Sequence, residues 1–321
     1  MNVERSTLRQ AQGKSPNIER RTSGTEYPEF RIQKPESRIQ KPASSPESFQ
    51  GKYPISRIKH LTLSVQRPAH KAQHPEPPMP ELPEVQILVN QLAARLTGAR
   101  IKAVEVRDAK IKLAHNATGR RIQRLRRRGK NIIFDLSGGL HLLVHLRMTG
   151  WFEFTEPKRH RAAIRTGKGT AYFEDGRRFG VMQVLTTVQL ERALAVLGPD
   201  PLVDDGDLSR LTKTSRAIKV ALLDQRLIAG IGNIYASESL WRARINPRRR
   251  ANRLSATELK ALRLGIIGSM RKAITYGPRI FEVQQFAVYD REGKPCRRCR
   301  TRIRRIVQAQ RSTFLCTKCQ R

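Results

Sequence analysis

Residues 79–98 read Met-Pro-Glu-Leu-Pro-Glu-Val-Gln-Ile-Leu-Val-Asn-Gln-Leu-Ala-Ala-Arg-Leu-Thr-Gly, and we expect an ordered fold to begin here. Pro83 stands near the first helical position and Glu84 places a carboxylate in the first turn, two features typical of a helix start. Gly98 supplies a stop at the other end. Between them, apolar residues recur at helical spacing: Val85, Leu88, Val89, Leu92 and Leu96. The stretch therefore predicts an amphipathic helix.

Residues 1–78 have a different composition, rich in Pro, Ser, Lys and Gln and poor in aromatic residues. They contain a near-repeat, Arg-Ile-Gln-Lys-Pro-Glu-Ser at 31–37 and Arg-Ile-Gln-Lys-Pro-Ala-Ser at 38–44. Such a segment buries too little apolar surface to offset the entropy of ordering it. We therefore expect a disordered or misassigned N-terminal extension. It has no apolar core typical of a signal peptide, and its acidic residues argue against an organellar transit peptide.

Two patterns follow the first helix. From about 100 to 190, short extended runs alternate with turns such as Gly138-Gly139, which predicts a β-sandwich. The expected strands are 101–106, 131–136, 140–146, 151–154, 171–173 and 181–185. After Leu197 the pattern becomes helical, with helices expected near 207–212, 216–224, 233–243 and 255–276. No apolar run approaches the roughly 18–20 residues that span a bilayer, so we expect an intracellular, soluble protein with no membrane partner.

All four cysteines of the chain lie near its C-terminus, as Cys296-Arg-Arg-Cys299 and Cys316-Thr-Lys-Cys319. Two such pairs at this separation can supply four thiolates to one tetrahedral zinc ion. Two disulfides or four ordinary thiols are the alternatives, which an intracellular setting disfavours. With four protein ligands the zinc has no open position, so its role is structural. Arginines surround the cysteine pairs, which predicts that the finger binds DNA or RNA. They are Arg297, Arg298, Arg300, Arg302, Arg304, Arg305 and Arg311.

The charge balance predicts a polyanionic partner. Lys and Arg number 63 against 27 Asp and Glu, which gives a formal net charge of +36. A folded body with this surplus presents it to phosphates, although RNA-binding proteins fit the charge as well as DNA-binding ones. The segment Gly230-Ile-Gly-Asn-Ile-Tyr-Ala-Ser-Glu238 offers free backbone N–H groups at a helix start, which predicts, weakly, a phosphate seat.

Several ordered blocks make residues 79–321 resemble the formamidopyrimidine-DNA glycosylases. The first is Pro-Glu-Leu-Pro-Glu-Val directly after Met79. The others, in the same order as in the family, are Arg128-Gly-Lys130, His145-Leu-Arg-Met-Thr-Gly150, Asp175-Gly-Arg-Arg-Phe-Gly180, Leu197-Gly-Pro-Asp-Pro201, Gly230-Ile-Gly-Asn233 and the cysteine pairs enclosing Gln310-Arg311. The match covers about three quarters of the chain.

The resemblance implies an α+β multidomain fold. A β-sandwich flanked by helices is expected at 79–195, a helix–two-turn–helix domain at 196–280 and a zinc finger with a β-hairpin at 285–321. It also implies one structural Zn²⁺, no small-molecule cofactor, damaged double-stranded DNA as the partner, a monomer, and a place in the bacterial cytoplasm near the nucleoid. The implied activity is excision of oxidised purines followed by cleavage of the abasic site through β,δ-elimination.

Four residues match the catalytic positions of the family. The amine of Pro80 would attack deoxyribose C1′ and form a Schiff base, and Glu81 would act as the general acid. Lys130 matches the lysine of β-elimination, and Arg311 the finger arginine of δ-elimination. An α-amine has a reference pKa of about 7.7–8.0, so part of it is nucleophilic at neutral pH. Inside the 321-residue chain Pro80 is instead an amide, so we predict translation from Met79 with removal of that Met, or proteolysis before Pro80.

Six further residues match the DNA-contacting positions of the family. Extruding a base leaves a hole in the stack, and three of them match the side chains that fill it: Met148, Arg177 and Phe179. The others match contacts to the DNA backbone, His160 more loosely than Lys219 and Asn233.

Three other functions compete with this one. An endonuclease VIII-like enzyme for oxidised pyrimidines shares the fold and the nucleophile. Leu82, where that branch usually has Gly, and the block Arg177-Arg178-Phe179 favour the purine branch. A non-catalytic DNA-binding zinc protein results if residues 1–79 stay attached, and a zinc-ribbon protein of translation explains only the charge and the cysteines. The connection from Tyr276 to Phe286 is shorter than in many bacterial members, which predicts that ring-opened purines are preferred over 8-oxoguanine.

Overall fold

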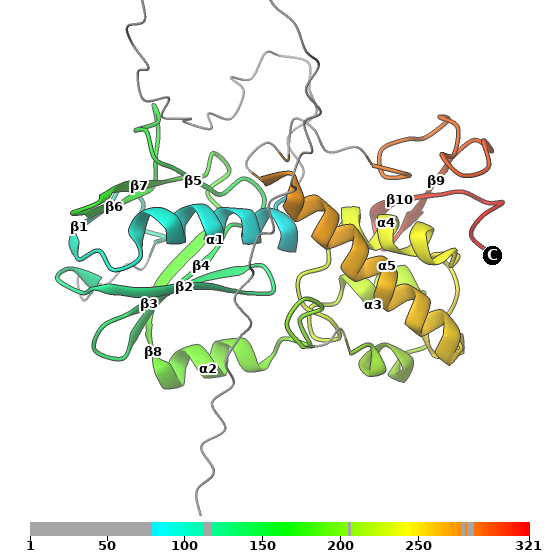
Figure 1. The fold of residues 1–321 in the computed structure, drawn as a ribbon, viewed down its shortest axis with the longest axis horizontal. Helices are drawn as coiled ribbons and strands as arrows, with labels where there is room; N and C mark the ends of the chain where they lie inside the picture. Colours follow the sequence, from blue (N-terminus) through cyan, green and yellow to red (C-terminus); the bar gives the residue numbers. More distant parts are fainter. Residues whose placement is uncertain (1–78, 112–116, 205–206, 278–279, 281–285) are drawn as a thin grey trace, which may run out of the picture. The chain divides into compact units, whose positions relative to one another are not determined.

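The computed structural model describes residues 79–111, 117–204, 207–277, 280 and 286–321 (Figure 1). The extension expected at 1–78 lies outside the described residues. The first helix, α1 (Leu82–Leu96), occupies the predicted stretch. Its first turn is closed by Glu84, whose Oε2 accepts a hydrogen bond from the Glu81 backbone N–H at 3.0 Å. No helix in the described part is long and apolar enough to cross a bilayer.

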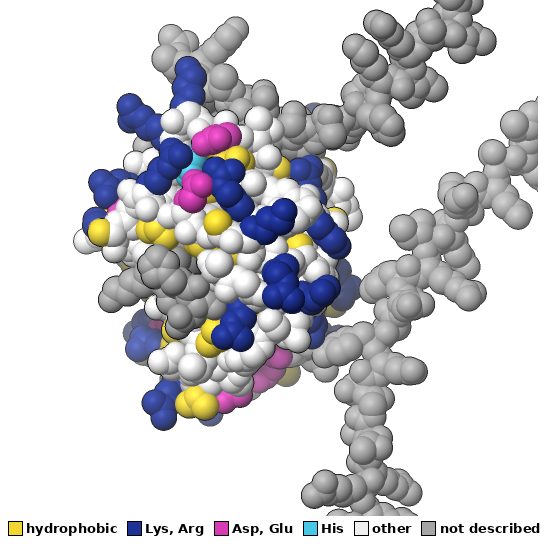
Figure 2. Space-filling model, turned by 90° about the vertical axis from the view of Figure 1, so that its left-hand side faces the viewer, with side chains coloured by type: hydrophobic (Ala, Val, Ile, Leu, Met, Phe, Trp, Pro, Cys, Tyr) yellow, Lys and Arg dark blue, Asp and Glu magenta, His cyan; other side chains and the backbone are white. Residues whose placement is uncertain are grey.

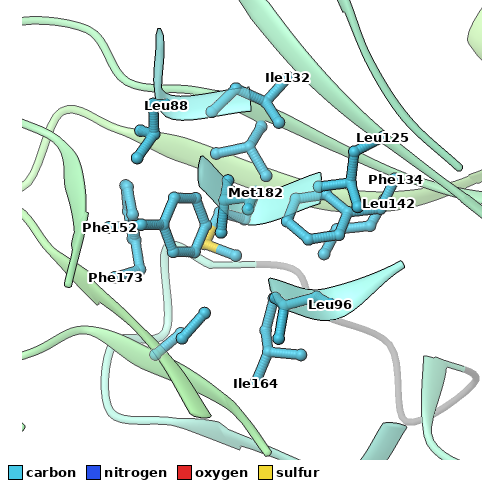
Figure 3. Packing of buried hydrophobic residues seen from close by; sticks show 14 of the residues in the cluster. Leu88, Leu96, Leu125, Ile132, Phe134, Leu142, Phe152, Ile164, Phe173 and Met182 are labelled. Atoms are coloured by element: carbon cyan, nitrogen blue, oxygen red, sulfur yellow. The ribbon is translucent and has the colours of Figure 1, made fainter. Parts of the chain in front are cut away.

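Two antiparallel four-stranded sheets follow α1, as the alternating pattern predicts. One has the order β1 (Ile101–Val106), β6 (Ala162–Thr166), β7 (Gly169–Glu174), β5 (Trp151–Glu153). The other has the order β2 (Ile122–Arg128), β3 (Asn131–Leu136), β4 (Leu140–His145), β8 (Val181–Thr186). Figure 3 shows side chains of both sheets and of α1 in one core, among them Leu88, Phe134, Phe152, Phe173 and Met182.

Three elements of this domain were not predicted. Strand β2 reads Ile-Gln-Arg-Leu-Arg-Arg-Arg, and its arginines obscure the alternation of apolar and polar residues that marks a strand. Strand β6 is short and starts with two alanines. The region after Val181 is not extended up to residue 190, since helix α2 (Thr187–Ala195) begins there. Leu190 is the buried residue of α2, and it packs on Ile133 and Leu143 at the outer face of the second sheet. Because so little of α2 is buried, its helical period was too weak to detect.

The second part of the fold is helical. It contains η2 (Ser209–Lys213), α3 (Ile218–Leu223), α4 (Asn233–Ala243), η3 (Ala251–Arg253) and α5 (Ala256–Thr275). The bounds predicted for α4 are confirmed and those for α5 differ by one residue, whereas the segment near 207–212 is a 3₁₀ helix. Leu82 and Ile87 of α1 belong to the apolar core of these helices. Helix α1 therefore packs into both parts of the fold.

The C-terminal part is a hairpin of β9 (Arg304–Gln308) and β10 (Arg311–Leu315). Ala309 and Gln310 connect the strands with φ angles of 47° and 58°, as a two-residue hairpin turn with left-handed backbone requires. A small core of Val288, Ile303 and Phe314 lies under the cysteines. Trp241 of α4 joins it, and the indole N–H donates to the Cys296 Sγ at 3.4 Å.

Candidate active site

Glu81 is buried against the start of α4, with 2% of its surface exposed. Its Oε2 accepts hydrogen bonds from the backbone N–H groups of Gly232 (2.7 Å) and Tyr235 (3.3 Å), and its Oε1 from that of Ile234 (2.8 Å). A Cβ on Gly232 would overlap the Glu81 carboxyl, so glycine is required there. Three of the N–H groups that the sequence offered to a phosphate, those of Gly232, Ile234 and Tyr235, thus donate to Glu81 instead. A phosphate contact in this segment stays a prediction for Asn233.

The pKa of Glu81 is set by opposing effects. Burial raises it above that of an exposed carboxyl, while the charge of Lys130 and the three backbone donors oppose the shift. A carboxyl next to Pro80 that is easier to protonate than usual suits a general acid.

Glu84 is a buried member of the site that the sequence identified only as a first-turn carboxylate. It is 2% exposed, and its Oε1 accepts a hydrogen bond from the Tyr235 hydroxyl at 2.7 Å. Burial, and then the nearby charge of Glu81, raise the pKa of Glu84 to about 7. The only available signal was its position three residues after Glu81, on the same face of the helix start.

Lys130 lies in the turn between β2 and β3, partly buried. Burial lowers the pKa of Lys130, Arg311 lowers it further, and Glu81 and Glu84 oppose the shift. These charges act on one another because the structure brings the β2–β3 turn, the start of α1 and the finger hairpin to one place. Arg311 is exposed at the first position of β10. The four residues predicted to be catalytic therefore lie together, and their roles stay predictions.

A buried ion pair holds the turn that carries Lys130. The guanidinium of Arg127 binds both carboxylate oxygens of Asp200, with a distance of 3.1 Å from Nη2 to Oδ1. The Gly129 N–H donates to the Asp200 Oδ2 at 2.8 Å, and Gly129 has a left-handed φ of +58°. Asp200, from the Leu197–Pro201 block, thus fixes the backbone directly before Lys130.

We expect Asp200→Asn to lower the free energy of unfolding by about 3–5 kcal/mol, because it leaves the Arg127 charge buried without its partner. Urea unfolding measures this. The pair between Arg165 and Glu105 (2.6 Å) is partly exposed and lies outside this turn, so Glu105→Gln is the matched control and should lower the free energy of unfolding far less. Equal losses for the two variants would show that the buried pair does not hold this turn.

Lys219 lies inside the protein. Its side chain has no exposed surface, and Nζ donates to Asn233 Oδ1 (2.6 Å), Thr313 Oγ1 (2.7 Å) and Ser312 O (3.0 Å). The Asn233 amide also donates to Ser312 O at 3.0 Å. Burial, and less so Arg311, lower the pKa of Lys219 to about 8. Lys219 and Asn233 thus connect the finger hairpin to the start of α4 through hydrogen bonds. The phosphate contacts predicted for these two residues stay predictions.

The three residues predicted to fill the DNA stack come from two neighbouring turns. Met148 is half-buried after β4, Arg177 is exposed, and Phe179 is 53% exposed, which is unusual for a large apolar side chain. The Arg177 Cζ lies 5.3 Å from the centre of the Phe179 ring. Exposure of this pair fits the predicted role.

His160, which was matched loosely to a DNA contact, is buried. Its side chain has no exposed surface, and within the described residues neither ring nitrogen has a hydrogen-bond partner. Its ring packs edge-on against Tyr172, and burial lowers the pKa of His160. Contact between this imidazole and DNA would require the side chain to move, and the DNA contact of His160 stays a prediction.

The four cysteines form a compact site. Their Sγ atoms lie within 4.8 Å of one another, with Cys299 to Cys316 at 3.4 Å and Cys296 to Cys319 at 4.0 Å. These distances are too long for disulfides, whose S–S length is about 2.05 Å. Zn–S bonds of about 2.3 Å in a tetrahedron place the sulfurs about 3.8 Å apart, so the cluster fits one structural zinc ion.

Basic side chains are not confined to the finger. Figure 2 shows one face of the protein, on which Lys and Arg side chains are spread among few Asp and Glu. Such a distribution suits contact with a phosphate backbone.

Comparison with known proteins identifies three matching family profiles. Residues 79–182 match the formamidopyrimidine-DNA glycosylase N-terminal domain, 197–285 its H2TH domain, and 293–321 the zinc finger found in FPG and IleRS. The formamidopyrimidine-DNA glycosylase of Roseiflexus sp. is 40% identical over 273 residues, which cover 76% of this chain and all of the relative.

Two solved complexes with DNA are similar in structure. The first is Lactococcus lactis FPG (MutM) with FAPY-dG-containing DNA, 30% identical, with a TM-score of 0.68, covering 75% of this chain and 99% of that one. The second is MutM with carbocyclic 8-oxo-G-containing DNA, 31% identical, with the same TM-score of 0.68 and the same coverage of 75% and 99%.

Proposed function

Because the chain belongs to the formamidopyrimidine-DNA glycosylase family, we propose that residues 79–321 excise oxidised purines from double-stranded DNA and then cleave the abasic site. The observation that carries the proposal is the burial of Glu81 beside Pro80, with Lys130 close enough for Glu81 and Lys130 to affect each other's pKa and with Arg311 close enough to lower the pKa of Lys130. Among relatives, a complex with FAPY-dG DNA supports the substrate class.

The proposed reaction starts at a free Pro80 amine. Its lone pair attacks C1′, the oxidised base leaves with the electron pair of the glycosidic bond, and the attacking nitrogen loses its proton. Glu81 protonates O4′ of the sugar, the C1′–O4′ bond breaks, and the nitrogen lone pair forms the iminium double bond to C1′. The resulting iminium ion acidifies the C2′ hydrogen, a base removes it, and the 3′ phosphate departs. A second elimination releases the 5′ phosphate, and hydrolysis of the iminium frees Pro80. Lys130 and Arg311 support these eliminations by stabilising the departing phosphates.

The proposal requires that Pro80 be the first residue of the active protein. An amide nitrogen has its lone pair delocalised into the carbonyl and does not attack C1′. We therefore propose that the active form begins at Pro80, after translation from Met79 or cleavage. We also propose domains at 79–195, 196–280 and 285–321, with the first boundary after α2 and the second in the connection that follows α5.

The test is release of base from a duplex that contains one formamidopyrimidine, by protein expressed from Met79. We expect release followed by strand cleavage. Release of an oxidised pyrimidine in preference to the purine would instead establish the endonuclease VIII-like function, and binding without release would establish a non-catalytic one.

Within this function, we expect ring-opened purines and further-oxidised guanines to be excised with a higher kcat/KM than 8-oxoguanine. The reason is the short connection between α5 and Phe286, which leaves little chain to close over flipped 8-oxoguanine. Residues 278–279 and 281–285 of that connection lie outside the described residues. Single-turnover excision from matched duplexes measures the ratio, and an equal or faster release of 8-oxoguanine would contradict the expectation.

A further inference from the structure

Arg161, at the start of the turn into β6, is a buried arginine between two aspartates from different parts of the sheet domain. It is 5% exposed. Its Nε donates to Asp108 Oδ2 at 2.7 Å, and its Nη1 donates to Asp175 Oδ2 at 2.7 Å and to the carbonyl of Gly180 at 2.9 Å. A buried guanidinium needs such partners, since losing one leaves a charge unpaired in a medium of low polarity. Arg161 therefore holds both aspartates in place.

Asp175 connects the two turns that carry the predicted stack-filling residues. Its Oδ1 accepts a hydrogen bond from the Thr149 hydroxyl, and its Oδ2 accepts one from the Gly180 N–H at 2.7 Å. The Thr149 oxygen in turn accepts the Arg177 N–H at 3.2 Å. One hydroxyl and one carboxylate thus join the turn after Met148 to the turn at 177–180.

Asp108 fixes the direction of the second turn. Its two oxygens accept hydrogen bonds from Arg178, at 2.8 Å from Nε and 3.0 Å from Nη2. Arg178 has a left-handed φ of +58°, a conformation that a non-glycine residue keeps only when its surroundings hold it. Arg177 and Phe179, on either side of Arg178, are exposed, and the ion pair with Asp108 fixes the backbone between them.

We propose that Arg161 is a positioning residue for base extrusion: through Asp175 and Asp108 it fixes Met148, Arg177 and Phe179 relative to one another before DNA binds. The proposal rests on the proposed function, in which these three side chains fill the hole left by the extruded nucleotide. Filling that hole offsets the cost of unstacking. If the two turns moved independently, they would have to be ordered during extrusion, and that entropy would slow the step.

The loss of rate on replacing Arg161 should depend on whether a base pair must be broken during extrusion. For Arg161→Met, we expect excision of a formamidopyrimidine paired with cytosine to fall about 10-fold to 100-fold, because the base pair must be broken. Schiff-base formation at a preformed abasic site, where no base pair is broken, should change less than about threefold. The fluorescence of a 2-aminopurine next to the lesion changes when the stack-filling residues enter the DNA. The rate of this fluorescence change should fall in parallel with the rate of excision.

The matched control is Arg165→Met in β6, the strand that begins directly after Arg161. Arg165 pairs with Glu105 at 2.6 Å on the surface and touches neither turn, so both rates and the fluorescence signal should stay unchanged. Thr149→Val is the second test variant, because it removes the hydroxyl link and keeps Arg161 and its charge. Thr149→Val should show the same loss of excision from the paired lesion with little change at the abasic site. It therefore tests the proposal even if Arg161→Met does not fold.

Three results would overturn the proposal. These are unchanged excision by both test variants, an equal loss on the paired lesion and the abasic site, or a loss of excision with a normal fluorescence signal. A failure of the proposed function itself is distinguishable, because the unmodified protein would then release no base from any of the duplexes.

Discussion

A chain that carries one alanine before Pro80 is expected to lose base excision by about 10⁴-fold or more relative to the chain that begins at Pro80. The added carbonyl turns the nitrogen of Pro80 into an amide and removes the nucleophile. Single-turnover release of formamidopyrimidine from a duplex measures the loss. Pro80 is buried two residues before the first residue of α1. One added residue is the smallest extension that converts its amine into an amide.

The control separates blocked chemistry from blocked binding. Pro80→Gly with a free N-terminus retains a primary amine, so it should keep measurable excision and trap an abasic site. The alanine-extended chain should still bind the abasic duplex within about tenfold of the unextended chain. If the extended chain excises at the rate of the unextended one, the nucleophile is another group.

The second large effect is expected for Glu81→Gln. Base excision should fall about 10²-fold to 10⁴-fold, because the variant has no proton to give to the sugar. Cleavage of a preformed abasic site should fall far less, because no base has to leave. The two rates are measured on duplexes of the same sequence that differ only in the lesion.

Glu81 also stabilises the fold, and its variant tests this too. The carboxylate accepts three backbone N–H groups, and the amide of Gln would turn its own N–H₂ toward at least one of them. The free energy of unfolding should therefore fall by about 1–3 kcal/mol. Glu84→Gln is the matched control for stability: with a pKa of about 7, Glu84 is half-protonated at neutral pH and the amide resembles that form. A loss of both reactions by the same factor would show that Glu81 acts only through the fold.

Local patterns were sufficient to predict much of this fold. The bounds of α4 follow from Gly232 before the first turn and from apolar residues at helical spacing. The strands β1 and β3 were predicted with their correct bounds, because each carries a β-like apolar run bordered by turns. The cysteine spacing predicted the site at which the four Sγ atoms converge.

Features that depend on distant partners could not be predicted. The charge of Arg127 can be buried because Asp200, 73 residues later, pairs with it. Since the local sequence does not show this partner, the basic run of β2 could not be recognised as a strand. Three N–H groups at the start of α4 donate to Glu81, which precedes Gly232 by 151 residues, and nothing near Gly232 in sequence indicates this partner. Lys219 was matched to a phosphate contact, and nothing near it in sequence shows that its ammonium group donates a hydrogen bond to the hydroxyl of Thr313, 94 residues later.

The central claim, that catalysis needs a free Pro80 amine, is tested most directly by borohydride trapping. Protein expressed from Met79 and the 321-residue chain are each incubated with an abasic duplex and then reduced, and intact mass defines the N-terminus of each. We expect a covalent adduct with the form that begins at Pro80 and none with a chain whose mass shows residues 1–79 attached. An adduct on that intact chain, or no adduct on either form, would contradict the account.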